Sequence, residues 1–223
     1  MKTDFNYLTI IPARAGSQRL PGKNMRLLGE IPLIGHSIAV AKANSLRNIV
    51  VTTNDAKVSN YAREEGVGVI DRPDYLAGDL EPTITALKHS LEQQKQKYDA
   101  VILLQPTNPL RPKNLLQEAL HEFEKADYDS LMTVSKSDKK LGRIVNNSFI
   151  PFNYEIGQRS QDLEPVYYEN GLLYIIKAEV IKEGKILGEK NCPFIVDHPF
   201  AEIDIDTLTD FKKAEVYLKA DFE

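Results

Sequence analysis

A basic segment with two glycines near the N-terminus has the composition of a phosphate-binding loop. Residues 14–24 read Arg-Ala-Gly-Ser-Gln-Arg-Leu-Pro-Gly-Lys-Asn and follow the apolar run at residues 8–13. A short apolar run predicts a buried strand, and parallel α/β sheets bind ligands where their strands end. Glycine lets backbone N–H groups approach phosphate oxygens, and Arg14, Arg19 and Lys23 can balance a polyanion's charge. The segment therefore predicts a phosphate site at a sheet edge, with a plain basic surface turn as the alternative.

The spacing of this loop excludes two well-known nucleotide-binding motifs. A P-loop has four residues between its glycines and a Ser or Thr after its lysine. Here five residues separate Gly16 from Gly22, and Asn24 follows Lys23. The G-x-G-x-x-G fingerprint of dinucleotide-binding proteins is also missing. Because this loop supplies no metal ligand, we expect residues further along the chain to do so.

Two carboxylates near the C-terminal end are suitable metal ligands. Asp204 and Asp206 alternate with Ile203 and Ile205. In the strand predicted over residues 202–206, the isoleucines would face the core and the carboxylates would project together. Mg²⁺ is typically bound by one or two protein carboxylates plus substrate phosphates. The alternative is that Asp206 caps the following helix, but the phosphate loop without its own metal ligand favours a metal.

Two other predicted strand ends carry polar residues to the same edge. The turn after the strand predicted at residues 100–104 is stiffened by two prolines, and it predicts a rigid display of polar groups for a polyhydroxylated, anionic substrate. The displayed residues are Gln105, Thr107, Asn108 and Arg111. A proline-rich connector is the alternative. Arg72 leaves the strand predicted at residues 67–71, either to donate to a base carbonyl or a phosphate or as a solvated loop charge.

Composition narrows the class of protein. The 223 residues are 42% hydrophobic and 27% charged, as in ordinary globular proteins. A net charge of −4 and a pI near 5.7 argue against a nucleic-acid partner. The only cysteine, Cys192, excludes an intrachain disulfide. We expect a cytoplasmic protein without a membrane partner, because signal-peptide-like and membrane-length apolar stretches are also missing.

Apolar runs alternate with amphipathic segments, which predicts an α/β fold with a mostly parallel, doubly wound sheet and helices on both faces. The predicted strands cover residues 8–13, 48–53, 67–71, 100–104, 130–134, 172–176 and 202–206. The predicted helices cover residues 32–43, 55–65, 83–97, 113–125 and 209–219. We expect residues 1–223 to form a single domain.

The alternation stops between residues 135 and 170, where polar and turn-forming residues dominate. Asn146-Asn147, between two short apolar runs, predicts a β-hairpin. A protruding hairpin cannot bury its own apolar face, whereas a second subunit would cover it. We therefore expect the 135–170 insertion to be a dimerisation arm of a homodimer, with a surface excursion that has no partner as the alternative.

Together these segments resemble the acylneuraminate cytidylyltransferases, also called CMP-sialic acid synthetases. The family pattern I-P-A-R-x-G-S-K-R-x-P-x-K-N is matched by residues 11–24, with Gln18 in place of the usual lysine. Further matches follow in the family's order over essentially the whole chain: Arg72-Pro73 with Leu76, Ala77 and Asp79, then residues 103–111, Gln161-Asp162-Leu163, Asn170-Gly171 and residues 203–207. The related Kdo cytidylyltransferases match less well after the first loop.

The resemblance implies a nucleotide-diphospho-sugar transferase-like fold, a dimerisation arm at residues 135–170, and a reaction. CTP and a nine-carbon 2-keto sugar acid would give the CMP-sugar and pyrophosphate, with Mg²⁺ as cofactor. The resemblance implies catalytic roles for Arg14, Lys23 and Asp206, and Mg²⁺ ligation by Asp204 and Asp206. It implies that the phosphates and ribose are contacted by Arg14, Ser17, Lys23 and Asn24. It also implies that Arg72 and Thr83 contact cytosine and that Gln105 contacts the sugar.

One departure leaves the sugar open. Family members often have an arginine shortly before Asn-Gly, where this chain has Tyr168. Either another cation, Arg159 or Arg111, holds the acid, or the pocket packs the sugar's amide and methyl groups on the aromatic ring. N-acetylneuraminate, legionaminate, pseudaminate and an 8-amino octulosonate are the candidates. A CMP-Kdo-type synthetase or another sugar nucleotidyltransferase is the alternative enzyme, and an inactive nucleotide-binding domain is the alternative of another class.

Overall fold

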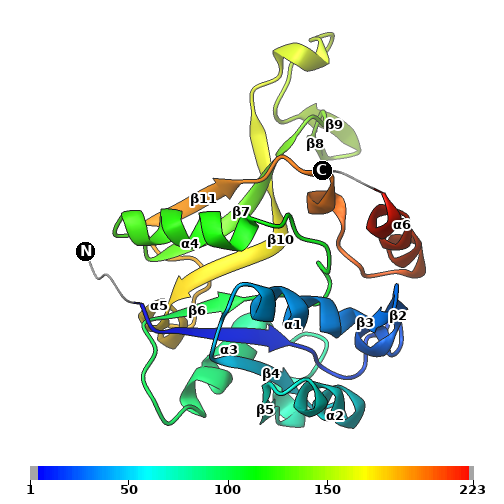
Figure 1. The fold of residues 1–223 in the computed structure, drawn as a ribbon. Helices are drawn as coiled ribbons and strands as arrows, with labels where there is room; N and C mark the ends of the chain where they lie inside the picture. The colour runs from blue at the N-terminus through cyan, green and yellow to red at the C-terminus, as the bar shows by residue number, and fades with distance from the viewer. Residues whose placement is uncertain (1–4, 221–223) are drawn as a thin grey trace.

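The computed structural model describes residues 5–220, so the outermost residues of the expected 1–223 domain lie outside it. A seven-stranded sheet runs through the molecule in the order β11-β7-β10-β6-β1-β4-β5 (Figure 1). Its strands are β1 (Tyr7–Pro12), β4 (Ile49–Thr53), β5 (Gly68–Asp71), β6 (Ala100–Leu103), β7 (Ser130–Ser137), β10 (Val166–Lys177) and β11 (Asn191–Ile195). Only β10 runs antiparallel to its neighbours within this sheet. The predicted mostly parallel sheet is confirmed.

Helices cover both faces of the sheet, because alternate side chains of each buried strand point to opposite sides. The helices are α1 (Leu33–Ala43), α2 (Ala56–Glu64), α3 (Thr83–Glu92), α4 (Leu115–Lys125), α5 (Ala178–Lys182) and α6 (Leu208–Lys219). On β6, Ile102 belongs to the core cluster that includes residues of α1, α2 and α4, whereas Val101 belongs to the cluster with α3 and α5. In Figure 1, α1 and α4 lie in front of the sheet and α3 and α5 behind it.

A third core cluster attaches the C-terminal part of the chain to the phosphate-loop region. Leu20 and Leu28 pack with Ile203, Ile205 and α6 residue Phe211. The 3-10 helix η1 (Lys23–Met25) and the two-stranded β2 (Leu27–Leu28) and β3 (Ile31–Pro32) complete this region. The cluster brings residues 20–33 together with residues 203–214, which are distant in the sequence.

Several element boundaries differ from prediction. Residues 202–206 do not form a strand: they follow the 3-10 helix η4 (Pro199–Glu202) as an extended segment. Helix α3 ends at Glu92 instead of residue 97, because the run at 93–97 has no apolar residue to pack against the sheet. Strand β11 and helix α5 were not predicted. Pro193 within β11 is compatible with a strand at the edge of the sheet.

The predicted hairpin is present. Strands β8 (Gly142–Val145) and β9 (Ser148–Pro151) pair antiparallel, joined by Asn146 and Asn147 at φ 49° and 61°. Two positive φ values in succession are typical of a type I′ turn, which matches the twist of the flanking strands. The hairpin projects from the body of the molecule beyond the long β7 and β10 strands (Figure 1). Its use as a dimerisation arm stays a prediction.

Two short 3-10 helices, η2 (Asp74–Leu76) and η3 (Ser160–Asp162), lie in the connections. Among the helices of residues 5–220, none is both long enough and apolar enough to cross a membrane.

Candidate active site

The strand order creates a crevice at the carboxyl ends of β1 and β6. The chain passes from β1 to β4 and β5 on one side, then returns to form β6 on the other side of β1. Ligands bind in α/β sheets at such a switch point. A cleft with a cavity volume of about 190 Å³ lies here. Seven predicted site residues line it: Arg14, Ser17, Lys23, Asn24, Arg72, Thr83 and Gln105.

The phosphate-binding loop is shaped by contacts within the protein. Gly16 and Gly22 have φ values of +77° and +66°, where a side chain would be strained. The Ala15 backbone N–H donates to Asn54 Oδ1 at 2.8 Å, and Asn24 Nδ2 donates to the Arg14 carbonyl at 3.2 Å. The loop therefore has a defined course before any ligand binds.

Asp206 joins this loop to the C-terminal segment. Lys23 Nζ lies 3.0 Å from Asp206 Oδ1 and donates to the Ile205 carbonyl at 2.8 Å, while Arg19 Nη2 lies 2.6 Å from Asp206 Oδ2. Helix α6 is capped instead by Thr207, which forms a reciprocal capping box with Asp210. The alternative role of Asp206 as the helix cap is therefore wrong.

The alternation predicted around Asp204 is present although the segment is not a strand. Ile203 and Ile205 are 1% and 0% exposed, while Asp204 points out of the core. The pKa of Asp204 is raised, mainly by desolvation and further by the charge of Asp206, although a hydrogen bond with Thr107 acts in the opposite direction. The Ile205 N–H donates to the Thr107 carbonyl at 2.8 Å, which ties this segment to the turn after β6.

Asp204 and Asp206 offer two carboxylates as possible metal ligands. Within residues 5–220 no group of three or more His, Cys, Asp or Glu side chains is arranged to hold a metal ion. A divalent cation here would need phosphate oxygens and water as its other ligands, which is how Mg²⁺ is commonly bound. Two carboxylates do not make a self-contained structural metal site, so ligation of Mg²⁺ by Asp204 and Asp206 stays a prediction.

Arg72 is a buried cation at the cleft rather than a solvated loop charge. It is 7% exposed, and its Nη2 and Nε donate to the carbonyl (2.8 Å) and Oγ1 (3.3 Å) of Thr52. Burial, and then the charge of Arg14, lowers the pKa of Arg72 to about 10. The guanidinium is thus fixed by neutral oxygens and lines the cleft.

Arg111 was predicted to be displayed to the substrate, and the structure contradicts this. The side chain is 8% exposed and donates to the carbonyls of Leu172 (2.7 Å) and Gln105 (2.9 Å) and to Ser37 Oγ (3.2 Å). Burial lowers its pKa to about 9. Arg111 therefore connects β10, the turn after β6 and α1, and it does not reach the cleft to hold a sugar carboxylate. Only Gln105 and Thr107 of the predicted display line the cleft.

Asn108 also points inward, so its predicted display is wrong. It is 1% exposed, and its Nδ2 donates to the carbonyls of Asn170 and Ile203, both at 3.0 Å. This close packing explains the Asn170-Gly171 pair. Gly171 has a φ of +76° within a bulge of β10, and a Cβ there would lie 2.7 Å from Asn108 Oδ1.

Two predicted sugar-binding residues lie outside the cleft. Arg159 is on the arm and forms a bidentate ion pair with Asp162, at 2.8 and 3.1 Å. Tyr168 lies on β10 opposite Ser135, is 41% exposed, and contributes weakly to the raised pKa of Lys213, whose main cause is a hydrogen bond with Glu202. Contact of either residue with a sugar stays a prediction.

Sequence reasoning missed the residues that hold the predicted ones in place. Asn54 and Thr52 support Ala15 and Arg72, and Asp79 pairs with Arg14 at 2.6 Å. Asn54 directly precedes Asp55, which is the N-cap of α2. Asp79 belongs to the family motif that begins at Arg72-Pro73, and this motif was the only sequence signal for it.

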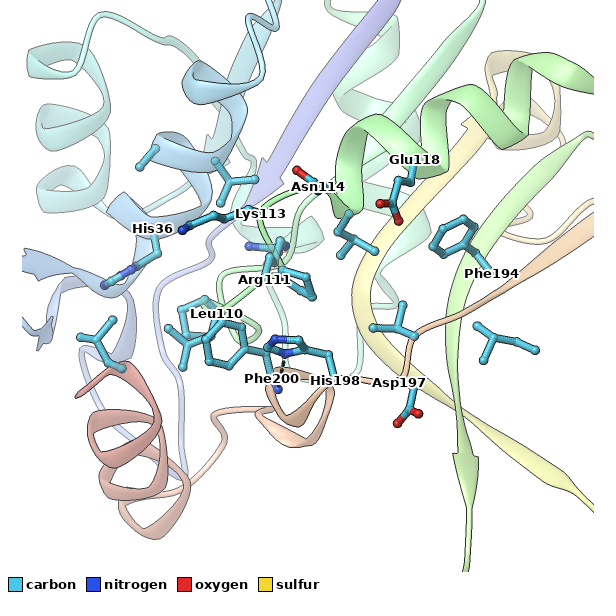
Figure 2. Close-up of a pocket in the computed structure, with 18 of the residues that line it drawn as sticks. His36, Leu110, Arg111, Lys113, Asn114, Glu118, Phe194, Asp197, His198 and Phe200 are labelled. Carbon is cyan, nitrogen blue, oxygen red and sulfur yellow. Dashed lines mark hydrogen bonds between the residues drawn. The ribbon is translucent and has the colours of Figure 1, made fainter. Parts of the chain in front are cut away.

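A second, larger hollow of about 820 Å³ lies between α1, α4 and the η4 region (Figure 2). Of the predicted substrate residues only Arg111 borders it. Its polar groups bind their own chain: His198 Nδ1 accepts from the Phe200 N–H at 3.1 Å, and His36 contacts the Leu28 carbonyl at 2.9 Å. Burial lowers the pKa of both histidines. The hollow contains none of the phosphate-loop residues that line the cleft.

A doubly wound sheet with a polar cleft at its switch point defines a nucleotide-binding α/β enzyme. A sequence model described as cytidylyltransferase matches residues 8–217, and the chain belongs to this family of nucleotidyltransferases. It is 35% identical, over 97% of both chains, to the CMP-N,N'-diacetyllegionaminic acid synthase of Legionella pneumophila. It is 30% identical, over 97% of both chains, to a pseudaminic acid cytidylyltransferase of Campylobacter jejuni.

Other relatives are longer or more distant. An N-acylneuraminate cytidylyltransferase of Streptococcus agalactiae is 30% identical over 92% of this chain, which spans only 51% of that protein. Among solved structures, a CMP:2-keto-3-deoxy-manno-octonic acid synthetase complexed with CTP matches with a TM-score of 0.72 and 18% identity, over 96% of this chain and 98% of its own. A likeness at this identity shows the shared nucleotidyltransferase fold.

Proposed function

We propose that this protein activates a nine-carbon 2-keto sugar acid with CTP, giving the CMP-sugar and pyrophosphate. One observation carries the proposal. Residues of a glycine-containing cationic loop and the buried Arg72 line one strand-end cleft, and Asp206 from a distant part of the sequence pairs with the cleft residue Lys23. The names of the relatives, which include synthases and cytidylyltransferases of three such acids, support this substrate class.

In the proposed reaction, the anomeric hydroxyl of the sugar attacks the α-phosphorus of CTP in line. A new P–O bond forms, the bond to the β-phosphate oxygen breaks, the hydroxyl proton leaves, and pyrophosphate departs. Arg14 and Lys23 would offset charge on the phosphates, helped by backbone N–H groups of the loop between Gly16 and Gly22. This preorganised positive charge would lower the barrier where negative charge accumulates.

The remaining cleft residues would select and orient the substrates. Arg72 and Thr83 line the cleft and would contact cytosine through hydrogen-bond donors and acceptors. Ser17 and Asn24 would contact the phosphates and ribose, and Gln105 the sugar. All five line the same cleft, which supports their joint assignment.

We further propose that Asp204 and Asp206 bind Mg²⁺ together with the nucleotide. The ion, when bound, would supply Lewis-acid stabilisation of charge on the phosphates. Asp206 already orients Lys23 and Arg19, so it would act on the loop as well as on the ion. Desolvation is the main cause of the raised pKa of Asp204 and the charge of Asp206 adds to it, so a bound cation would favour the ionised carboxylate.

We also propose that residues 135–170 mediate homodimerisation and that the enzyme acts in the cytoplasm. Apolar side chains of the hairpin and its flanks are largely exposed, with Ile144 at 77%, Phe149 at 53% and Phe152 at 59%. Contiguous exposed apolar surface of this kind marks protein–protein interfaces. The lone Cys192, which is a buried thiol, suits a reducing compartment.

A pyrophosphate-release assay tests the proposed reaction. CTP, UTP and ATP would each be paired with N-acetylneuraminate, legionaminate, pseudaminate and an octulosonate. We expect pyrophosphate release only when CTP is combined with a nine-carbon acid. The Asp206→Asn protein serves as the low-turnover control. CTP-selective release that does not depend on any keto acid would contradict the proposal.

The same panel would assign the sugar. Tyr168 offers an aromatic ring instead of a guanidinium, so we expect a preference for acids whose acylamino and methyl groups pack on it. Tyr168→Arg should then change kcat/KM for legionaminate and N-acetylneuraminate in opposite directions. Equal kcat/KM for all nine-carbon acids, unchanged in the variant, would place Tyr168 outside the sugar site.

A further inference from the structure

Asp79 connects the phosphate-binding loop to the segment between β5 and α3. Arg14 Nη2 lies 2.6 Å from Asp79 Oδ1, and Gln18 Nε2 donates to Asp79 Oδ2. Asp79 stands between β5 and α3, in the segment that also carries Arg72. One carboxylate therefore joins the loop to a segment that contributes Arg72 to the cleft.

Two arginines lie close together in the cleft, and they have different partners. Arg14 and Arg72 line the same small cavity, and the charge of Arg14 is one cause of the lowered pKa of Arg72. Arg72 is hydrogen-bonded to neutral Thr52 atoms, whereas Arg14 has the Asp79 carboxylate. Asp79 thus supplies negative charge to Arg14, one of the cations expected to hold the phosphates.

The contact is suited to exchange. The Arg14 and Asp79 side chains remain 32% and 40% exposed, so water and solutes reach the pair. Exposed ion pairs contribute little net stability, whereas phosphates accept short, charge-assisted hydrogen bonds from arginine. Gln18 offers Asp79 only a neutral amide at a position where the family pattern has lysine. The hold of Asp79 on the loop is correspondingly weak in this chain.

We propose that Asp79 is a positioning residue that holds Arg14 at the cleft in the free protein and releases it to the phosphates of the incoming nucleotide. This inference rests on the proposed function and extends it to how the nucleotide enters. Asp79 acts as an internal substitute for the phosphate anion. It keeps Arg14 directed at the cleft, and its own negative charge opposes nucleotide binding until the exchange occurs.

Calorimetric titration of the free enzyme tests this exchange. CTP, inorganic tripolyphosphate and cytidine would be titrated into the wild type, Asp79→Asn and Glu81→Gln. Glu81 lines the same cleft and carries the same charge without an ion pair to Arg14, so its variant is the matched control. Asp79→Asn should tighten CTP and tripolyphosphate by about threefold to fivefold and leave cytidine unchanged, because neutralising the competing carboxylate removes one exposed ion pair. Glu81→Gln should change the same affinities less than about twofold.

The other outcomes overturn the inference. Equal gains in both variants would mean that only net charge matters. Weaker CTP binding by Asp79→Asn would mean that Asp79 stays on Arg14 in the complex. Thermal unfolding of each free variant checks the fold, and Asp79→Ser replaces Asn if that variant is unstable. If the wild type binds no CTP while tripolyphosphate still responds to Asp79, the proposed function fails and the exchange stands.

Discussion

The cleft buries charged side chains, whereas the arm at residues 135–170 exposes apolar ones. Lys23 and Arg72 are 9% and 7% exposed, while Ile144 and Ile156 on the arm are 77% and 78% exposed. Burying charge is costly unless it is paired, and large exposed apolar groups are uncommon away from interfaces. Both regions therefore have free energy to gain from a binding partner, an anionic ligand for the cleft and an apolar surface for the arm.

The two regions are also built differently. Cleft residues come from segments far apart in the chain, such as Lys23 and Asp206, which meet at 3.0 Å. The arm is held by local contacts: Leu141 N–H donates to Asn153 Oδ1 at 2.8 Å, and Asn153 Nδ2 donates to the Lys139 carbonyl at 3.0 Å. Mutations should therefore separate catalysis from assembly.

The largest effect is expected at the carboxylate pair. Asp206→Asn should lower kcat by about 100-fold to 1,000-fold, since one preorganised charge at a reacting centre is worth this much. The variant keeps the shape of the side chain, so the oligomeric state should not change. Pyrophosphate release at saturating Mg²⁺ and light scattering measure the two properties.

Glu65→Gln is the control for this prediction, because Glu65 forms an ion pair of 2.6 Å with Lys42 on the surface. Its turnover should match that of the wild type. Near-wild-type turnover of Asp206→Asn would remove the metal assignment, and loss of the oligomer would break the separation of the two regions.

The next effect concerns assembly. Replacing Ile144 and Phe149 together by serine should raise the dimer dissociation constant at least about 100-fold, because central apolar interface residues each contribute about 2 kcal/mol or more. Leu80→Ser is the matched control, since Leu80 is 99% exposed outside the arm. Sedimentation across a concentration series measures the constants. A wild type that is monomeric at micromolar concentration would show that the arm has another purpose.

A smaller effect on stability is expected at Arg111. Arg111→Met removes the donor to the buried carbonyls of Leu172 and Gln105, and unfulfilled buried acceptors cost about 2 kcal/mol. Urea unfolding should show this loss of stability. The affinity for a sugar acid should change only if the loss of Arg111 displaces Gln105, the proposed sugar contact. A stable variant with a large, selective rise in KM for the sugar would instead indicate that Arg111 binds the substrate.

Arg72 and Arg111 show how far the sequence could predict this site. Both arginines follow buried strands, and the mostly parallel sheet was correctly expected from the alternation of apolar and amphipathic segments. The direction of each side chain depends on partners that are distant in sequence, Thr52 for Arg72 and Leu172 for Arg111. Local patterns carry no information about such partners. The inward packing of Asn108 against the bulge at Gly171 was missed for the same reason.

The hairpin was predictable because its signal is local. Asn146 and Asn147 tolerate positive φ, and apolar residues flank them, so the turn type follows from four or five residues. Strand 202–206 was a wrong prediction on the same kind of pattern. Ile203 and Ile205 alternate with carboxylates, but they pack into the cluster beside α6 and not into a sheet. Alternation reports which side chains are buried, not whether a neighbouring strand is present.

The smallest expected effect is a pH dependence that belongs to the cleft alone. Desolvation and the charge of Asp206 raise the pKa of Asp204, so folding favours its protonated form. The stability that Asp204 contributes is therefore fully present below the ordinary aspartate pKa and is lost as pH rises through the raised pKa. Because Asp204 is exposed overall, solvent screening limits the loss to about 0.5 kcal/mol.

Urea unfolding across this pH window would measure the effect as the difference between the wild type and Asp204→Asn, which cannot titrate there. The wild type should lose stability relative to the variant as pH rises. Saturating Mg²⁺ with CTP should reverse the sign, because a bound cation favours the charged carboxylate. The arm variants should show the same pH dependence as the wild type, since no arm group is among the causes of this pKa shift. The prediction fails if the difference in unfolding free energy between the wild type and Asp204→Asn does not vary with pH, or if Mg²⁺ and CTP do not change it. Asp204 would then have no role in metal binding, and Asp206 would be the only carboxylate of the pair with such a role.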